Sequence, residues 1–246
     1  MKIWHKENSK LLDIVKISID KHFPTLHIIF ENDVMFIRGA LHLTEINDFY
    51  SIEIELSHSY PDKLPFVRET GGRIPHIGER HIFMNGNCCL FVEEETWRYY
   101  PKGMSLVEFI QKIVMGYFMN QSYFEHTGKW LWGDRSHGIS GILEFYKEEL
   151  KTNDLKLIYA FIEYLAKETL KKHRICYCGS NKKLQDCHFL QLKDYREKIK
   201  TDTARMSLHL FDVELEKYKQ LRFAEQRKLE GQILNRNLFG IKTIYP

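Results

Sequence analysis

The sequence has few cysteines, no long apolar run and no strong excess of either charge. Five cysteines among 246 residues are an odd number and too few for a disulfide framework, so we expect ligands, nucleophiles or packed thiols in a reducing compartment. No run is long enough to cross a bilayer. Lys6, Glu7 and Lys10 stand where a signal peptide has its apolar segment. These absences predict a cytoplasmic protein without a membrane partner.

Two further classes of partner are not expected. A formal net charge of +3, from 36 basic and 33 acidic residues, gives no bulk attraction to nucleic acid or to an anionic membrane. No glycine fingerprint for a nucleotide connects a strand pattern to a helix pattern, because Gly71-Gly72 lacks the following helix. We therefore expect that the chain does not adenylate a carboxylate itself.

Hydrophobic spacing predicts an α+β fold in which a helix precedes strands and further helices follow them. Residues 9–22 repeat apolar positions at helical spacing, and the strand patterns lie at 26–33, 34–43, 48–57 and 66–70. The clean alternation in 48–57 predicts an antiparallel meander. The later helices are expected from a Ser105/Glu108 capping box to about residue 123, at 137–150, at 154–172 with Asn153 as its cap, and within 190–235.

Two of the five cysteines are adjacent, in the stretch HIFMNGNCCLF at residues 81–91. Adjacent cysteines do not easily bridge each other, and their spacing does not suit joint chelation of a metal. At least one of them is expected to serve sulfur chemistry or core packing. The pair alone leaves both interpretations open.

The order of elements, together with three separate motifs, resembles the ubiquitin-conjugating enzyme family over about residues 10–150. The motifs are Tyr60-Pro61 with Pro65, the run Gly86-Asn87-Cys88-Cys89-Leu90, and Trp97 eight positions after Cys89. The first departs from the family pattern, since Leu64 stands in place of a proline. The resemblance implies that residues 1–150 form a ubiquitin-conjugating-enzyme-like domain with an N-terminal helix, a four-stranded antiparallel meander and C-terminal helices.

The same resemblance implies roles for residues of the cysteine loop. Cys89 falls on the catalytic cysteine, which carries an acyl group as a thioester, and Cys88 falls on a buried aliphatic position. His81 takes the place of the family's asparagine and could donate a hydrogen bond to an oxyanion or accept a proton from an amine, or serve only the loop structure. Prokaryotic relatives resemble this chain in having a histidine there. Asn85 and Gly86 are expected in a turn, and Trp97 is expected to be buried beside the loop.

The other three cysteines lie with a histidine in CYCGSNKKLQDCH, residues 176–188. Three thiolates and an imidazole suit tetrahedral zinc, and Gly179-Ser180 predicts the turn that brings them together. The segment resembles the SEC-C motif, Cys-x-Cys-Gly-Ser-x-x-Lys-x-x-x-Cys-His. We therefore expect structural zinc bound by Cys176, Cys178, Cys187 and His188, within a helical extension spanning 151–246.

A local basic patch surrounds this motif. Its members are Lys171, Lys172, His173, Arg174, Lys182 and Lys183. Such a patch is usually a solvated face and can also contact phosphate. We favour the solvated face.

The resemblance also implies a function and a partner. A lone conjugating-type domain with His81 looks like the short version found in bacterial antiphage systems of the CBASS type. The implied partner is a cGAS/DncV-like nucleotidyltransferase, whose C-terminal carboxyl would be held at Cys89 and passed to an amine, with an activating enzyme possible in trans. The alternative is a non-catalytic module that recognises a protein C-terminal tail. A zinc hydrolase is not expected, because four protein ligands leave no open position on the metal.

Overall fold

Four strands form one antiparallel sheet in the computed structural model, which describes residues 3–131, 135–136, 138–217 and 219–220. The strands are β1 (Leu26–Glu31), β2 (Val34–Leu43), β3 (Asp48–Leu56) and β4 (Phe66–Glu69), and they lie in the order β1-β2-β3-β4. Each pairs antiparallel with the next along the chain. The predicted meander and the α+β class are confirmed.

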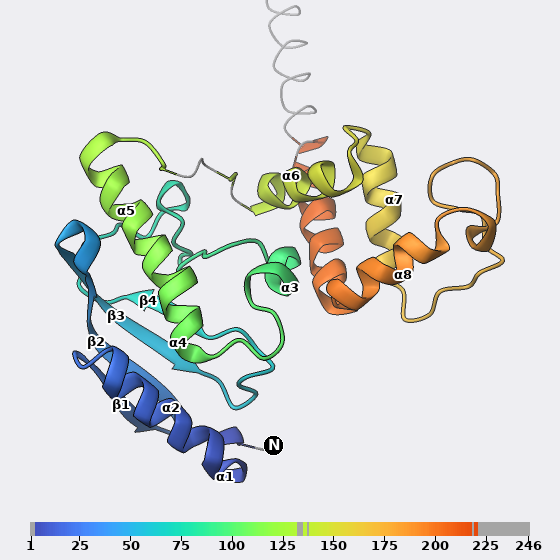
Figure 1. The fold of residues 1–246 in the computed structure, drawn as a ribbon. Coiled ribbons are helices and arrows are strands. Elements are labelled where there is room, and N and C mark those ends of the chain that lie inside the picture. Colours follow the sequence, from blue (N-terminus) through green and yellow to red (C-terminus); the bar gives the residue numbers. More distant parts are fainter. Residues whose placement is uncertain (1–2, 132–134, 137, 218, 221–246) are drawn as a thin grey trace, which may run out of the picture. The chain divides into compact units, whose positions relative to one another are not determined.

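The alternation in β3 determines which face of the sheet is buried. Tyr50, Ile52, Ile54 and Leu56 are each at most 1% exposed. Successive side chains of a strand point to opposite faces, so this register places all four on the face that the helices cover (Figure 1).

Six described helices accompany this sheet. They are α1 (Trp4–Glu7), α2 (Ser9–His22), α3 (Thr96–Tyr99), α4 (Leu106–Phe109), α5 (Met115–Thr127) and α6 (Gly138–Leu150). A π-helical turn, Ile110–Val114, connects α4 to α5, and short 3-10 turns occur at Thr44–Ile46, Gly78–Arg80 and Glu93–Glu95. The Ser105/Glu108 capping box is present as predicted. The helix behind it extends past residue 123 to Thr127, where Gly128 adopts a left-handed φ of 67°.

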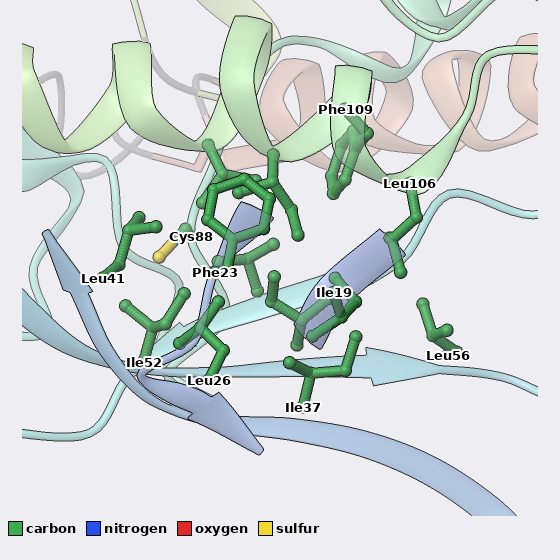
Figure 2. Close-up of a cluster of buried hydrophobic side chains, with 14 of the residues drawn as sticks. Ile19, Phe23, Leu26, Ile37, Leu41, Ile52, Leu56, Cys88, Leu106 and Phe109 are labelled. Atoms are coloured by element: carbon green, nitrogen blue, oxygen red, sulfur yellow. The ribbon is translucent and has the colours of Figure 1, made fainter. Parts of the chain in front are cut away.

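The core lies between the sheet and the helices α2 and α4 (Figure 2). Ile19 and Phe23 reach it from α2 and its end, and Leu106 and Phe109 from α4. Cys88 belongs to the same cluster and is 8% exposed. The prediction that Cys88 packs as a small apolar residue is therefore confirmed.

Helix α7 (Leu155–Leu165) corrects two expectations. Its N-cap is Asp154, whose side chain accepts hydrogen bonds from the amides of Lys156 and Leu157, and not Asn153. The helix ends at Leu165 and not at residue 172. The segment after the helix pairs with residues that follow it in the chain. The Arg174 carbonyl accepts a hydrogen bond of 2.7 Å from the Leu184 amide.

The remaining described elements are a 3-10 turn at Leu184–Asp186, helix α8 (Phe189–Lys198), and a helical segment at 201–217. The helix expected within 190–235 is therefore interrupted near residue 200, and its part beyond residue 220 lies outside the described residues. The described residues of Met1–Asn153 form one compact unit with Asp194–Ile199, and those of Asp154–Lys193 and Lys200–Pro246 form a second. Among the described helices, none combines the length and the apolar character that crossing a membrane demands.

Candidate functional site

Backbone hydrogen bonds hold the cysteine pair between two parts of the chain. The Cys88 amide donates to the Val67 carbonyl of β4 over 2.7 Å, and the Cys89 amide donates to the His81 carbonyl over 2.7 Å. Ile82 and Cys88 also form an isolated antiparallel bridge. The loop is thus anchored to the sheet on one side and to residues 81–82 on the other.

A tight turn precedes the cysteines. The Gly86 amide donates to the Phe83 carbonyl over 2.8 Å, and the Phe83 amide donates to the Asn87 carbonyl over 2.9 Å. The Asn85 side-chain oxygen accepts the Asn87 amide over 3.1 Å, a local bond typical of asparagine in turns. Gly86 has a φ of 82°, a conformation that side chains with a Cβ rarely adopt.

The two neighbouring sulfurs have different environments. Cys88 is buried, whereas Cys89 is partly exposed. Burial raises the pKa of the Cys88 thiol to about 12, although a hydrogen bond with Tyr117 lowers this pKa in part. Burial alone raises the pKa of the Cys89 thiol to about 11. Of the two sulfurs, Cys89 is therefore the less buried, and its thiol is protonated at neutral pH.

His81 joins the loop through its backbone and contacts an aromatic side chain through its ring. It follows the 3-10 turn Gly78–Arg80 in a left-handed conformation with a φ of 51°. Its carbonyl accepts the Cys89 amide and also the Tyr117 hydroxyl, the latter over 3.0 Å. The imidazole and the Trp130 indole have centroids 4.9 Å apart and planes at 80°. This edge contact restricts the orientation of the imidazole.

Three residues that sequence reasoning did not single out fix the His81 segment to α5. Arg80 donates to the Gln121 side-chain oxygen over 2.9 and 3.0 Å, and the Gln121 amide group returns a bond of 2.7 Å to the Arg80 carbonyl. Tyr117 lies one turn earlier on the same face. Gln121 is fully buried. A glutamine four residues after Tyr117, on the same face of the helix, was the available signal, because a buried amide needs a partner.

Trp97 is less buried than the sequence predicts. The side chain is half-buried, not buried, because it lies in the short surface helix α3. Cations cover its ring, with the Lys198 amino group 4.7 Å and the Arg98 guanidinium 5.0 Å from the ring centroid.

The second site collects the four predicted zinc ligands. The ligand atoms of Cys176, Cys178, Cys187 and His188 all lie within 4.8 Å of one another. Nδ1 of His188 is 3.1 Å from the Cys187 sulfur and 3.3 Å from the Cys176 sulfur, and the Cys178 and Cys187 sulfurs are 3.6 Å apart. The predicted convergence of these four residues is confirmed.

Two short antiparallel segments create this convergence. Ile175 and Lys183 form a bridge, and the Cys176 amide donates to the Lys182 carbonyl over 2.8 Å. Gly179 and Asn181, with φ values of 73° and 59°, turn the chain between them. The donor set suits zinc, since Zn–S bonds of about 2.3 Å in a tetrahedron separate sulfurs by about 3.8 Å.

The surroundings of the Cys178 thiol lower its pKa. Burial opposes its ionisation, but hydrogen bonds with Ser180 and with Cys187 outweigh burial and lower its pKa. The Ser180 hydroxyl lies 3.2 Å from the Cys178 sulfur and 3.5 Å from the Cys187 sulfur. A serine between two thiols thus supports the ionised form that a metal binds.

Comparisons with known proteins identify no family. No protein-family model and no curated protein matches the chain. Among solved structures, the chain is similar to one described as a complex of the Vps23 UEV with ubiquitin, with 15% identity and a TM-score of 0.32. The similarity covers 44% of this chain and 80% of that one.

Proposed function

We propose that the protein is a ubiquitin-conjugating-enzyme-like acyl carrier, which holds the C-terminal carboxyl of a protein partner on Cys89 as a thioester and transfers it to an amine. The observation that carries the proposal is the difference between the two adjacent cysteines, of which Cys88 is packed in the core and Cys89 is partly exposed. A nucleophile needs access to its substrate, and Cys89 is the more exposed of the two.

Both proposed steps balance without an added reductant or oxidant. In the first, the Cys89 sulfur attacks an activated acyl group, a C–S bond forms, and the thiol proton leaves with the displaced group. In the second, a lysine amine attacks the thioester, the C–S bond breaks, and an amide and the Cys89 thiol result. His81 would stabilise the oxyanion of the tetrahedral intermediate or accept the amine proton.

The acyl donor must arrive activated. A free carboxylate does not acylate a thiol, and the sequence has no nucleotide-binding fingerprint. We propose a cGAS/DncV-like nucleotidyltransferase of a bacterial CBASS antiphage system as the source of the C-terminal tail, with activation by an enzyme in trans. Cytoplasmic action agrees with this partner.

Zinc completes the proposal as a structural cofactor. Cys176, Cys178, Cys187 and His188 would hold it and close all four positions, so the metal would stabilise the local fold and take no part in acyl transfer.

The test uses a peptide with the sequence of the partner's tail, synthesised as a C-terminal thioester. Intact mass spectrometry should detect one peptide adduct on the full chain, and hydroxylamine should remove it. Cys89→Ser should give either no adduct or a stable oxyester. The matched control, Cys88→Val, should acylate normally, because only its volume is required in the core.

If Cys88→Val loses the adduct and Cys89→Ser acylates normally, the nucleophile is Cys88. A hydroxylamine-sensitive adduct that persists in both variants would place the acyl group on another thiol and contradict the proposal.

One observation favours a second function, a non-catalytic module that binds a protein C-terminal tail. Burial raises the pKa of Cys89 to about 11, and a protonated thiol without an activating charge is also what an inert cysteine shows. Fluorescence anisotropy with the unactivated tail peptide separates the two functions. Binding that is equal in wild type and Cys89→Ser, without any adduct from the thioester peptide, would establish the binding module.

A further inference from the structure

A concave region in the second unit has no role in the proposed acyl transfer. It follows the C-terminal end of α7 and has a volume of about 300 Å³. Its lining includes Tyr164, Lys167, Glu168, Lys171, Arg174 and Arg205. Four of these six side chains are cationic and one is acidic, so the concavity is strongly basic.

Part of this charge is already neutralised within the protein. Arg205 donates to the Glu168 carboxylate over 3.2 Å and to the Ala166 carbonyl over 3.2 Å. The carbonyls at a helix C-terminus attract cations, which explains the position of Arg205 without any ligand. This arginine and Glu168 form one wall with little net charge.

Among the residues that the structure describes, no carboxylate forms an ion pair with the other three cations. Lys167 places its amino group 4.1 Å from the Tyr164 ring centroid. Lys171 and Arg174 make no ion pair with any residue in the described parts of the chain. Like charges that converge on a concave surface repel one another, and an anion between them relieves that repulsion.

We propose that this pocket binds the phosphate chain of a small oligophosphate, such as inorganic tripolyphosphate or a nucleoside triphosphate. The planar guanidinium of Arg174 suits two oxygens of one phosphate, and the amino groups of Lys167 and Lys171 act as point charges toward its neighbours. A volume of about 300 Å³ is at the lower end for small-molecule sites. The proposal concerns the second unit and stands independently of thioester chemistry at Cys89.

The structure thereby divides the basic patch that the sequence presents as a single group. Lys171 and Arg174 line the pocket, whereas Lys182 and Lys183 do not line it. This division supplies a matched pair of double variants that remove the same charge from the same patch, inside or outside the pocket.

Isothermal titration of the zinc-containing full chain with inorganic tripolyphosphate tests the proposal. We expect saturable binding of one anion, weakened when the ionic strength is raised to about 0.15 M and beyond. Lys171→Gln with Arg174→Gln should reduce the affinity by about tenfold or more. Lys182→Gln with Lys183→Gln should leave it unchanged. Zinc content and circular dichroism of both variants should equal those of wild type.

Two further ligands identify the source of the phosphates. ATP that binds more tightly than tripolyphosphate would assign a nucleotide, and equal affinity would assign the phosphate chain alone. The proposal is overturned if tripolyphosphate and ATP do not bind, or if both double variants lose affinity equally. Binding of a single-stranded RNA oligonucleotide in the absence of tripolyphosphate binding would also overturn it, because an extended surface would then replace the pocket.

Discussion

The backbone amide of Cys89 donates a hydrogen bond of 2.7 Å to the carbonyl of His81, eight positions earlier in the chain. The bond fixes the backbone of the proposed nucleophile to that of the proposed oxyanion donor. The Tyr117 hydroxyl bonds the same carbonyl over 3.0 Å and thereby ties both residues to α5. The two side chains are thus presented by one small, locally rigid unit.

The raised pKa of Cys89 predicts that its thiol reacts slowly with electrophiles and that the rate depends steeply on pH. With a pKa of about 11, about 0.1% of the thiol is ionised at pH 8, against about 10% for a cysteine of ordinary pKa near 9. Alkylation by iodoacetamide should be about a hundredfold slower than for an exposed thiol and should rise about tenfold per pH unit. Tandem mass spectrometry with cleavage between residues 88 and 89 assigns the alkylation to Cys89. A rate that levels off below pH 9 would reveal a nearby group that lowers the thiol pKa.

Removal of the Tyr117 hydroxyl should destabilise the loop anchor. Tyr117→Phe loses the hydrogen bond to the His81 carbonyl, and the expected decrease in the free energy of unfolding is about 1 kcal/mol. Tyr123→Phe is the matched control, because Tyr123 is 39% exposed on the same helix. Urea unfolding measures both. Equal stability of the two variants would show that the hydroxyl contributes nothing to the fold.

Local signals explain which parts of the fold could be predicted from the sequence. The alternation in β3 and the Ser105/Glu108 capping box each involve residues that are close in sequence. Both elements could therefore be predicted from the sequence. The end of α7 could not, because the segment predicted as its last turns bonds to a part of the chain that is distant in sequence: the Gln185 amide donates to the Lys172 carbonyl, thirteen positions earlier.

In the candidate site, too, local motifs were predictable from the sequence and long-range contacts were not. The motifs placed the two cysteines and His81, but Arg80 and Gln121 meet across 41 positions, and no local pattern pairs them. The Trp97 ring likewise contacts Lys198, which is distant in sequence. Contacts of this kind require the folded chain.

Zinc removal should unfold the ligand region of the second unit. Purified protein should contain about one zinc per chain, and Cys178→Ser should lose the metal together with thermal stability, because metal binding contributes to folding. Ser180→Ala should keep the metal with affinity reduced by about tenfold or more, since its hydroxyl contacts two of the sulfurs. Atomic absorption and differential scanning calorimetry provide the measurements. Metal-free protein of unchanged melting temperature would refute the structural role.

Substitutions at His81 can separate the role of its side chain from that of its backbone. The φ of 51° costs energy for most residues with a Cβ, is tolerated by asparagine, and is easy for glycine. His81→Gly therefore removes the imidazole while it permits the same backbone conformation, and His81→Ala removes the imidazole and adds strain. His81→Asn keeps a hydrogen-bond donor in a tolerated conformation.

If the imidazole stabilises the oxyanion, single-turnover aminolysis of the acylated protein should slow by about 10²-fold in His81→Gly. His81→Ala should slow at least as much, and His81→Asn should recover part of the rate, because an amide also donates. Initial acylation of Cys89 and binding of the tail peptide should persist in all three variants. If the glycine variant transfers at the wild-type rate and only the alanine variant slows, His81 acts through its backbone conformation, and the imidazole has no part in the chemistry.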